Sequence, residues 1–342
     1  MLTDTRASLD KRTALIYNRM IQPHSNALST PKLIAIDMDG TLLDSEGHVS
    51  ERNRAALRNA EEAGIEVVIA TGRRHSFAMR VLRDLKLRHT NALVSSNGTV
   101  IRTIGSELLH RSHMPLETAR WLCQHVAEFR STLVLTFDTV GDDGEDTRGA
   151  LVVEDPEELY SNIERWMQSN EAYIAHVPSL EDALDGDPPI QMMLCGPVDR
   201  MRQAEALLME HPLITPVGAS THPGAEIALH RTEYPGRDLC ILDILPAGCS
   251  KASALERLAE LRGISMLDVL AIGDNWNDLP MLEIAGQSVL MSNAPEALKE
   301  LAGERGWTIG HSNDEDGVAV AIETALNIVS APGATEKPVM VV

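Results

Sequence analysis

The sequence is poor in aromatic residues and in any pairing of cysteines. Phenylalanine, tryptophan and tyrosine make up 3% of the 342 residues, so aliphatic side chains and methionine must fill the core. The four cysteines include no Cys-x-x-Cys pair, which excludes the spacing of common metal sites and of a disulfide framework. We expect reduced, mostly buried thiols and a cytoplasmic protein, since neither a signal-peptide pattern nor a membrane-spanning run is present.

Positive charge is also scarce, and the formal net charge at pH 7 is -20. We therefore expect neither nucleic acid nor an anionic membrane as a partner, because both would repel such a chain. An anionic substrate would have to be held by local cations. The length is enough for about two domains. No feature of the sequence indicates an oligomeric state.

Residues 33–41, with the sequence LIAIDMDGT, combine an apolar run with two acidic residues and a glycine. Such a run predicts a strand buried on both faces, in the middle of a parallel sheet. Ligands of parallel sheets bind beyond the carboxyl ends of the strands, which is where Asp37 and Asp39 are expected. Side chains at i and i+2 of a strand point the same way, so the two carboxylates must share a proton or a cation.

A second strand is predicted at residues 66–70 (EVVIA), and it ends at Thr71 and Gly72. A helical pattern separates it from the first strand, which predicts a βαβ unit with parallel strands. Thr71 then lies at the same sheet edge as the two aspartates. We expect surface positions for the nearby Arg73 and His75, with contact to the substrate as the alternative.

A change of texture near residue 115 predicts a second, inserted domain. Helical segments alternate there with short strands and acidic, turn-rich loops, until the first pattern returns near residue 237. The densest acidic loop, 141–146, lacks the spacing of a calcium loop and is expected to be a solvated hairpin. The predicted bounds are 1–30 for an N-terminal extension, 31–114 and 238–342 for a core domain, and 115–237 for an inserted α/β cap.

Lys251 stands out by its rarity and by its place. Six lysines accompany 24 arginines, and Lys251 is the only lysine between Lys86 and Lys299. Ser250 suits the N-cap of a helix, so Lys251 falls in the first helical turn, where the helix dipole repels cations. A nearby negative group would offset that repulsion; a solvated surface lysine is the alternative.

A later strand, predicted at 267–272, runs into the sequence GDNWND at 273–278. One Gly-Asp pair at a strand end is weak evidence, whereas the longer Gly-Asp-x-x-Asn-Asp pattern is specific. Asp274, Asn277 and Asp278 are therefore candidate site residues, with capping of the next helix as an alternative role for Asp278.

These strand ends bring carboxylates, a hydroxyl and an ammonium group to one edge of the predicted sheet. That set suits phosphoryl transfer, which depends on positioning and on neutralising charge. A carboxylate can attack phosphorus, and a second carboxyl can carry the proton. A hard cation such as Mg²⁺, held by oxygen ligands, can neutralise the phosphate.

The motifs, in this order, resemble those of the haloacid dehalogenase (HAD) superfamily, and above all of its Cof-like subfamily. The likeness spans residues 33–328, and it implies a Rossmann-like α/β core with a parallel sheet and a cap inserted between the second and third motifs. The run SKASAL at 250–255 is similar to the family's Ser-Lys-Gly-x-Ala-Leu. Ala252 replaces the usual glycine, a change that should leave the role of the lysine intact.

The resemblance also implies a role for each motif residue. Asp37 would be the nucleophile, and Asp39 would be the general acid/base that meets the metal through its backbone carbonyl. The full set that it implies is Thr71, Gly72, Lys251 and Asn277 for phosphate or substrate, Asp37, Asp39 and Asp274 for the metal, and Asp278 for orienting Lys251 or a metal-bound water.

The predicted activity is Mg²⁺-dependent hydrolysis of a small phosphomonoester, through an aspartyl-phosphate intermediate. Sugar phosphates, flavin mononucleotide and pyridoxal phosphate all agree with the resemblance, and the cap is expected to select among them. Two alternatives stay open. One is a phosphotransferase or mutase of the same fold, and the other is a non-catalytic protein that binds a phosphorylated metabolite.

Overall fold

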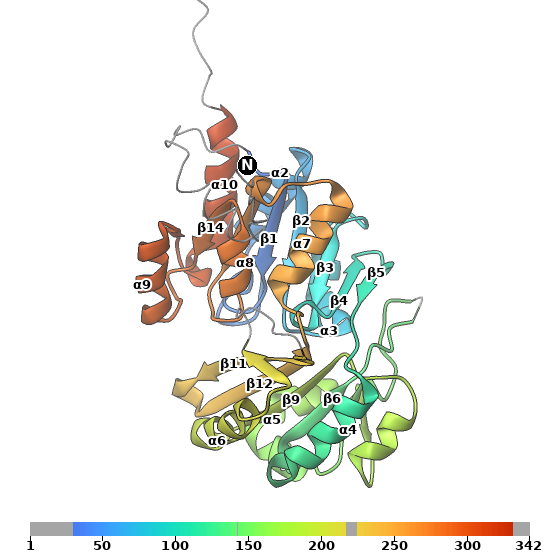
Figure 1. The fold of residues 1–342 in the computed structure, drawn as a ribbon. Helices are drawn as coiled ribbons and strands as arrows, with labels where there is room; N and C mark the ends of the chain where they lie inside the picture. The colour runs from blue at the N-terminus through green and yellow to red at the C-terminus, as the bar shows by residue number, and fades with distance from the viewer. Residues whose placement is uncertain (1–29, 142, 217–223, 331–342) are drawn as a thin grey trace, which may run out of the picture.

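The computed structural model describes residues 30–141, 143–216 and 224–330, which form two α/β domains, one above the other in Figure 1. The N-terminal extension predicted at 1–30 lies outside the described residues, except for residue 30. Each domain is built on a single sheet, with eight strands in the core domain and seven in the cap. No helix within the described ranges is long and apolar enough to cross a membrane.

The core sheet has β1 near its middle, as the sequence predicts. Its strands, in sheet order, are β15 (Thr308–Ile309), β14 (Gln287–Leu290), β13 (Val269–Gly273), β1 (Leu33–Asp37), β2 (Glu66–Ala70), β3 (Ala92–Ser95), β4 (Val100–Thr103) and β5 (Leu108–Arg111). The strands from β15 to β3 are parallel, and β4 and β5 extend the sheet antiparallel. The carboxyl ends of β1, β2 and β13 therefore meet at one edge.

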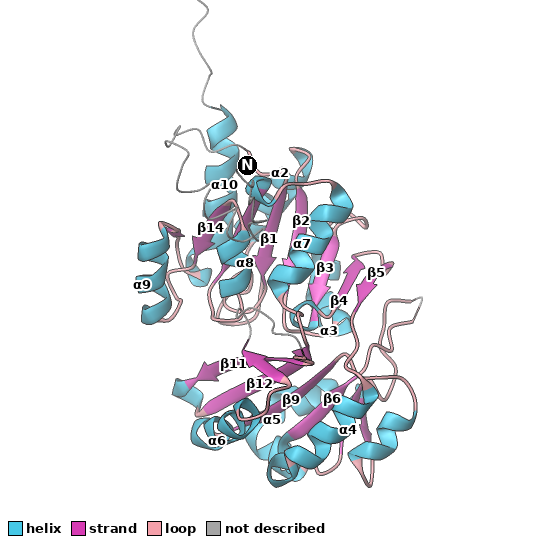
Figure 2. Ribbon diagram, viewed as in Figure 1, coloured by secondary structure: helices cyan, strands magenta, loops and turns pink. Residues whose placement is uncertain are grey.

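Helices cover both faces of the core sheet, as Figure 2 shows. Residues of β1 alternate between the two faces: Ile34 and Ile36 pack against one layer of helices, and Leu33 and Ala35 pack against the other. The first layer comprises α2 (Glu51–Glu62), α3 (His75–Leu82) and α10 (Gly317–Ser330), and the second comprises α7 (Lys251–Arg262), α8 (Leu279–Ile284) and α9 (Glu296–Arg305). All four β1 residues are fully buried, which confirms the predicted central strand.

The cap sheet is mixed, and its two faces are covered differently. Its strands, in sheet order, are β10 (Ile214–Pro216), β11 (Ile227–Tyr234), β12 (Leu239–Pro246), β9 (Gln191–Gly196), β6 (Leu133–Thr136), β7 (Leu151–Val153) and β8 (Ile174–His176). Helices α4 (Leu116–His125) and α6 (Val198–Met209) pack on one face. Helix α5 (Glu157–Asn170) packs on the other face and leaves part of it open toward the core domain.

The cap sheet extends beyond the boundary predicted after residue 237. Strand β12 lies in this sheet, antiparallel to β11 and to β9, although residues 238–342 were expected in the core. The turn at Pro235–Arg237 joins two strands of a hairpin and does not return the chain to the core. We therefore propose that the cap ends near Pro246, shortly before α7 begins at Lys251.

Gly98 marks a close approach between the β3–β4 hairpin and the start of α7. It has a φ of +99°, and a Cβ at this position would lie 2.1 Å from the backbone oxygen of Ser250. Gly64, beyond the end of α2, has a φ of +82° but no atom within 4 Å of such a Cβ. The two glycines therefore share a left-handed backbone and differ in the space around them.

We expect Gly98→Ala to lower the free energy of unfolding by about 3 kcal/mol, because backbone strain and overpacking both contribute. Gly64→Ala should lower it by about 1 kcal/mol, because only the strain applies. Urea unfolding of both variants measures the difference. Equal losses would contradict the prediction, since the contact with Ser250 would then relax at no cost.

Candidate active site

Lys251 lies at the centre of the site, below the ends of β1 and β13. Its Nζ atom is 2.5 Å from Oδ1 of Asp37 and 2.6 Å from Oδ1 of Asp278, and its side chain is fully buried. Ser250 caps α7 by accepting a hydrogen bond from the backbone N–H of Ser253. The structure confirms that carboxylates offset the position of Lys251 in the first turn, and it excludes a solvated surface lysine.

Asp278 connects Lys251 to the loop that follows β13. Its Oδ1 accepts the hydrogen bond from Lys251, and its Oδ2 accepts from the backbone N–H groups of Asp274, at 2.9 Å, and Asn275, at 3.1 Å. Asp278 occupies the N-cap position of α8, yet its side chain makes no capping hydrogen bond. The alternative role as a helix cap is therefore not observed, and the carboxylate fixes both Lys251 and the loop.

Three buried carboxylates gather around this lysine. Asp37, Asp274 and Asp278 each offer an oxygen within 4.8 Å of the other two. Oδ1 of Asp274 also accepts a hydrogen bond from Thr41 Oγ1 at 3.0 Å. Gly40 permits this approach, because a Cβ there would lie 2.5 Å from Oδ2 of Asp274.

Burial and mutual repulsion change the protonation of these groups. Burial, followed by the charge of Asp278, raises the pKa of Asp37 to about 7 although Lys251 opposes the shift. Burial, followed by the charges of Asp37 and Asp278, raises the pKa of Asp274 to about 9. Burial alone would lower the pKa of the Lys251 ammonium, but Asp278 and Asp37 together hold it above its usual value. Lys251 therefore stays charged.

The donor set fits a hard divalent cation. Three carboxylates face a single ammonium, so the site would hold an excess of negative charge if all three were ionised. The raised pKa values of Asp37 and Asp274 show that ionising these carboxylates is unfavourable without a further cation. Carboxylate oxygens are the ligands that Mg²⁺ and Ca²⁺ prefer. The family resemblance implies Asp37, Asp274 and the backbone carbonyl of Asp39 around a metal. The side chains that cluster here are those of Asp37, Asp274 and also Asp278.

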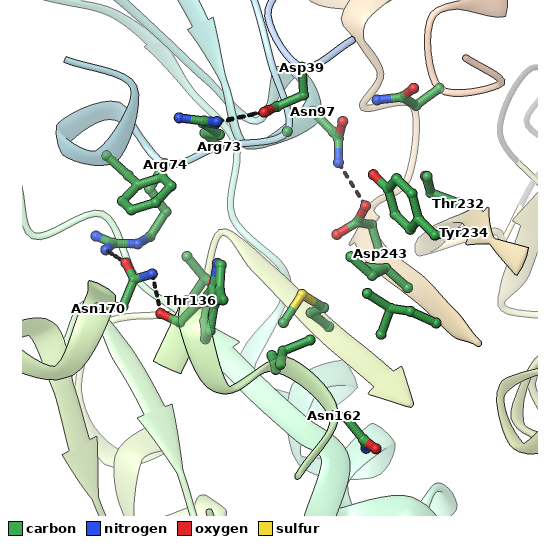
Figure 3. Close-up of a pocket in the computed structure, with 18 of the residues that line it drawn as sticks. Asp39, Arg73, Arg74, Asn97, Thr136, Asn162, Asn170, Thr232, Tyr234 and Asp243 are labelled. Atoms are coloured by element: carbon green, nitrogen blue, oxygen red, sulfur yellow. Dashed lines mark hydrogen bonds and ion pairs between the residues drawn. The ribbon is translucent and has the colours of Figure 1, made fainter. Parts of the chain in front are cut away.

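Asp39 turns its carboxylate away from this cluster and toward Arg73. The guanidinium donates from Nε to Oδ2 at 2.8 Å and from Nη2 to Oδ1 at 2.5 Å, a bidentate pair that Figure 3 shows at the top of the pocket. The expectation that Arg73 and His75 are surface residues was wrong, since Arg73 lines the pocket and His75 is buried. The place of Arg73, directly after Thr71 and Gly72 at a strand end, could have indicated its role.

Thr71, Gly72 and Asn97 form the next part of the edge. Thr71 is fully buried, and its Oγ1 accepts a hydrogen bond from the backbone N–H of Arg73 at 3.1 Å. Ser96 and Asn97 both have positive φ angles, of 48° and 53°. Such backbone strain is typical of functional sites. Two side-chain oxygens of this strained turn, Ser96 Oγ and Asn97 Oδ1, are buried without a hydrogen-bond partner among the described residues, and Asn97 lines the pocket where a ligand could meet it.

A pocket of about 520 Å³ lies between the core and the cap, next to these groups. Its size suits a small-molecule ligand. Among the predicted site residues, Asp37, Asp39, Gly72 and Asn277 line it, while Thr71, Lys251, Asp274 and Asp278 lie behind its wall. The residues that line it from the cap include Thr136, Asn162, Trp166, Gln191, Thr232, Tyr234 and Asp243.

Asp243 carries the cap's polar contact with the core, and the sequence did not reveal it. Its Oδ2 accepts a hydrogen bond from Asn97 Nδ2 at 2.9 Å, and its Oδ1 accepts one from Gln191 Nε2 at 2.5 Å. Burial raises the pKa of Asp243 to about 6, against the effect of these two hydrogen bonds. No local motif marks Asp243, because its partners are far away in the sequence.

A second contact between the domains involves the acidic loop. Asp146 is buried and forms an ion pair with Arg74, so the expectation of a solvated acidic hairpin was wrong for this residue. Arg74 also donates from Nη2 to Oδ1 of Asn170 in α5 at 2.7 Å (Figure 3). The guanidinium of Arg74 therefore ties the start of α3 to two parts of the cap.

Comparison with known proteins agrees with this geometry. The family model for haloacid dehalogenase-like hydrolases matches residues 34–322. The chain is 32% identical to the 5-amino-6-(5-phospho-D-ribitylamino)uracil phosphatase YwtE of Bacillus subtilis, over 86% of this chain and 98% of that protein. It is 28% identical to the HMP-PP phosphatase of Escherichia fergusonii, over 78% of this chain and 86% of that protein.

Among solved structures, a haloacid dehalogenase-like hydrolase from Bacteroides thetaiotaomicron is similar, with a TM-score of 0.66 and 28% identity. The match covers 86% of this chain and 99% of that structure. The chain therefore belongs to the haloacid dehalogenase-like hydrolases, which confirms the family that the four motifs predict. Within that family it is a phosphatase with an inserted cap.

The raised pKa values of Asp37 and Asp274 predict a pH effect on stability. A carboxyl group with a raised pKa keeps its proton in the folded state at a pH where the unfolded chain has lost it, so stability falls as pH rises toward that pKa. In metal-free buffer we expect the free energy of unfolding to fall between pH 7 and 8 by about 1.4 kcal/mol for each proton retained. That window lies above the usual titration of histidine and below that of the thiols.

Urea unfolding in chelator, with and without saturating Mg²⁺, measures this slope. Mg²⁺ should flatten it, because a bound cation replaces the protons, and Asp274→Asn should make it shallower in chelator. If the slope is the same in all three cases, these carboxylates are neither protonated at neutral pH nor ligands of the cation.

Proposed function

We propose that this protein is a Mg²⁺-dependent phosphatase that hydrolyses a small phosphomonoester through a phosphoryl group carried on Asp37. The observation that carries the proposal is the buried contact of Lys251 with Asp37 and Asp278, beside Asp274 and below a pocket of ligand size. The family supports the reaction class, since relatives of this chain are phosphatases of small phosphorylated metabolites by name.

Asp37 suits the part of the nucleophile. Lys251 holds its Oδ1, which leaves Oδ2 to attack phosphorus as the bond to the leaving oxygen breaks. The same ammonium lies close enough to draw charge from the phosphate oxygens as they pass through the transition state. Asp278 keeps Lys251 in place, because it accepts from the ammonium and from two backbone N–H groups.

Asp39 suits the part of the general acid and base. Its carboxyl group lines the pocket, two residues from Asp37, and is about half exposed, with a side-chain accessibility of 52%. It would give its proton to the leaving oxygen and then take a proton from the water that attacks the phosphoryl group on Asp37. Arg73 holds both carboxylate oxygens of Asp39, so this ion pair would have to open when Asp39 carries the proton.

The remaining motif residues would bind phosphate, substrate and metal. Thr71, Gly72 and Asn277 lie at the same edge and are proposed for phosphate and substrate. Asp37, Asp274 and the backbone carbonyl of Asp39 would hold Mg²⁺, with Asp278 as a further carboxylate neighbour. When bound, Mg²⁺ would supply positive charge that neutralises the phosphate and the carboxylates around it.

The cap would exclude water during the first step and select the substrate. Asp243 and Asn170 support this role, since both join the cap to core residues at the rim of the pocket. We also propose a cytoplasmic location, on the ground that all four cysteines are free and buried.

Labelling of the enzyme tests the proposed intermediate. With p-nitrophenyl [³²P]phosphate, whose leaving group needs no proton, Asp39→Asn should still take up label but release it about 10²–10⁴-fold more slowly. Acid-quenched Asp39→Asn protein should therefore carry label that hydroxylamine removes. Asp37→Asn should carry none, and Asp84→Asn, an exposed aspartate of the 3₁₀ turn after α3, should behave as the wild type.

The fate of the label separates the alternatives. Release as inorganic phosphate supports a phosphatase, and transfer to an added sugar hydroxyl supports a phosphotransferase or mutase. Substrate that binds tightly and is recovered unchanged in Mg²⁺ would support the non-catalytic binding protein. Label that persists in Asp37→Asn would contradict the role of Asp37.

A further inference from the structure

The cap side of the pocket carries two arginines that the phosphatase machinery does not use. Arg165 lies in α5, and Arg237 lies in the turn between β11 and β12; both are exposed and both line the pocket. Neither side chain forms an ion pair or a hydrogen bond with any of the residues that the structure describes. The two guanidinium groups therefore line the pocket as cations without a carboxylate partner among the described residues.

A break in α5 places Arg165 on the pocket wall. Ile163 has φ -137° and ψ 43°, far from helical values, so the backbone turns in the middle of the helix. Six consecutive residues, 161–166, consequently line the pocket, which a regular helix with 3.6 residues per turn would not allow. Arg165 forms no ion pair with its neighbour Glu164, whose carboxylate also lines the pocket and accepts a hydrogen bond from Gln168.

Free arginines in the pocket are unexpected in this chain. Its net charge is -20, and most of the described arginines form ion pairs with carboxylates. The two arginines that line the pocket from the core are paired, Arg73 with Asp39 and Arg74 with Asp146. An unpaired guanidinium raises the local positive potential and offers planar donors that match phosphate and carboxylate.

We propose that the substrate carries a second anionic group, a phosphate or a carboxylate, on its leaving group, and that Arg165 and Arg237 bind it. This inference rests on the proposed phosphatase function, which assigns the core side of the pocket, at Asp37, to the phosphate that is hydrolysed. A pocket of about 520 Å³ leaves room for a leaving group between the core side and the cap side. The second anion would raise affinity and fix the direction in which the substrate lies.

The experiment uses matched substrates of graded length. In the first series, we would compare α,ω-alkanediol bisphosphates, from propanediol to octanediol, with the corresponding monophosphates. In the second, we would compare the phosphate esters of ω-hydroxyalkanoic acids with alkyl phosphates of the same length. In Mg²⁺, we expect wild-type protein to show a KM about tenfold lower for the best member with two anions than for its partner with one. The two series distinguish phosphate from carboxylate as the second anion.

Variants assign this preference to the two arginines. Arg165→Gln and Arg237→Gln should each raise KM for the substrates with two anions by about tenfold and leave kcat and the substrates with one anion nearly unchanged. Arg58→Gln is the matched control, because Arg58 is an exposed arginine of α2 with no partner among the described residues and lies outside the pocket. It should leave every KM as it is.

Three results would overturn the inference. The first is the absence of any preference for a second anion across both series. The second is a preference that survives both substitutions, and the third is an equal rise in KM for both kinds of substrate, which would show that the arginines hold the phosphate that is hydrolysed. If no substrate is turned over, calorimetric binding of the same bisphosphates and monophosphates to Asp37→Asn protein tests the anion site separately from the proposed activity.

Discussion

The structure depends on one buried ammonium among three buried carboxylates. Removing either sign alone would leave uncompensated charge in the interior, which costs several kcal/mol. The fold meets this constraint by delivering the groups from separate elements: Asp37 ends β1, Lys251 begins α7, and Asp278 follows β13. The parallel sheet brings these three side chains together, because the carboxyl ends of its strands lie at one edge. Stability and chemistry are therefore coupled at the same few atoms.

The contacts between the domains follow a similar electrostatic logic on a larger scale. The chain has a net charge of -20 and therefore an excess of carboxylates. Its arginines form ion pairs with some of these carboxylates across the boundary between the domains. Arg74 links α3 to Asp146 and Asn170 in the cap, and Arg102 and Asp138 form another ion pair between the domains. These ion pairs are polar contacts between the cap and the core. Such an interface can separate more readily than a hydrophobic one, as a cap that admits substrate requires.

The parts of the fold that the sequence predicts are those that local patterns determine. The apolar run of β1 and the residues at its end, the Gly273-Asp274 pair at the end of β13, and the Ser250 cap before Lys251 are all encoded within a few residues. The parts that sequence reasoning missed depend on partners far apart in the chain. Arg74 and Asp146 are 72 positions apart, and Asp243 meets Asn97 across 146 positions. The same reason explains the boundary error: β12 reads as a core strand until its pairing with β11 and β9 is known.

The core side and the cap side of the pocket differ in how much of their role the fold determines. The motif residues of the core side are buried groups that hold one another, so they can change little without loss of stability. The cap side includes the broken stretch of α5 and the turn between β11 and β12, where Arg165 and Arg237 contribute nothing to the described fold's ion pairs. Substitutions at these two positions could therefore change the preferred substrate without removing an ion pair of the described fold. In the proposed function, charge buried in the core would preserve the chemistry and charge exposed in the cap would select the leaving group, a division that suits a family with one reaction and many substrates.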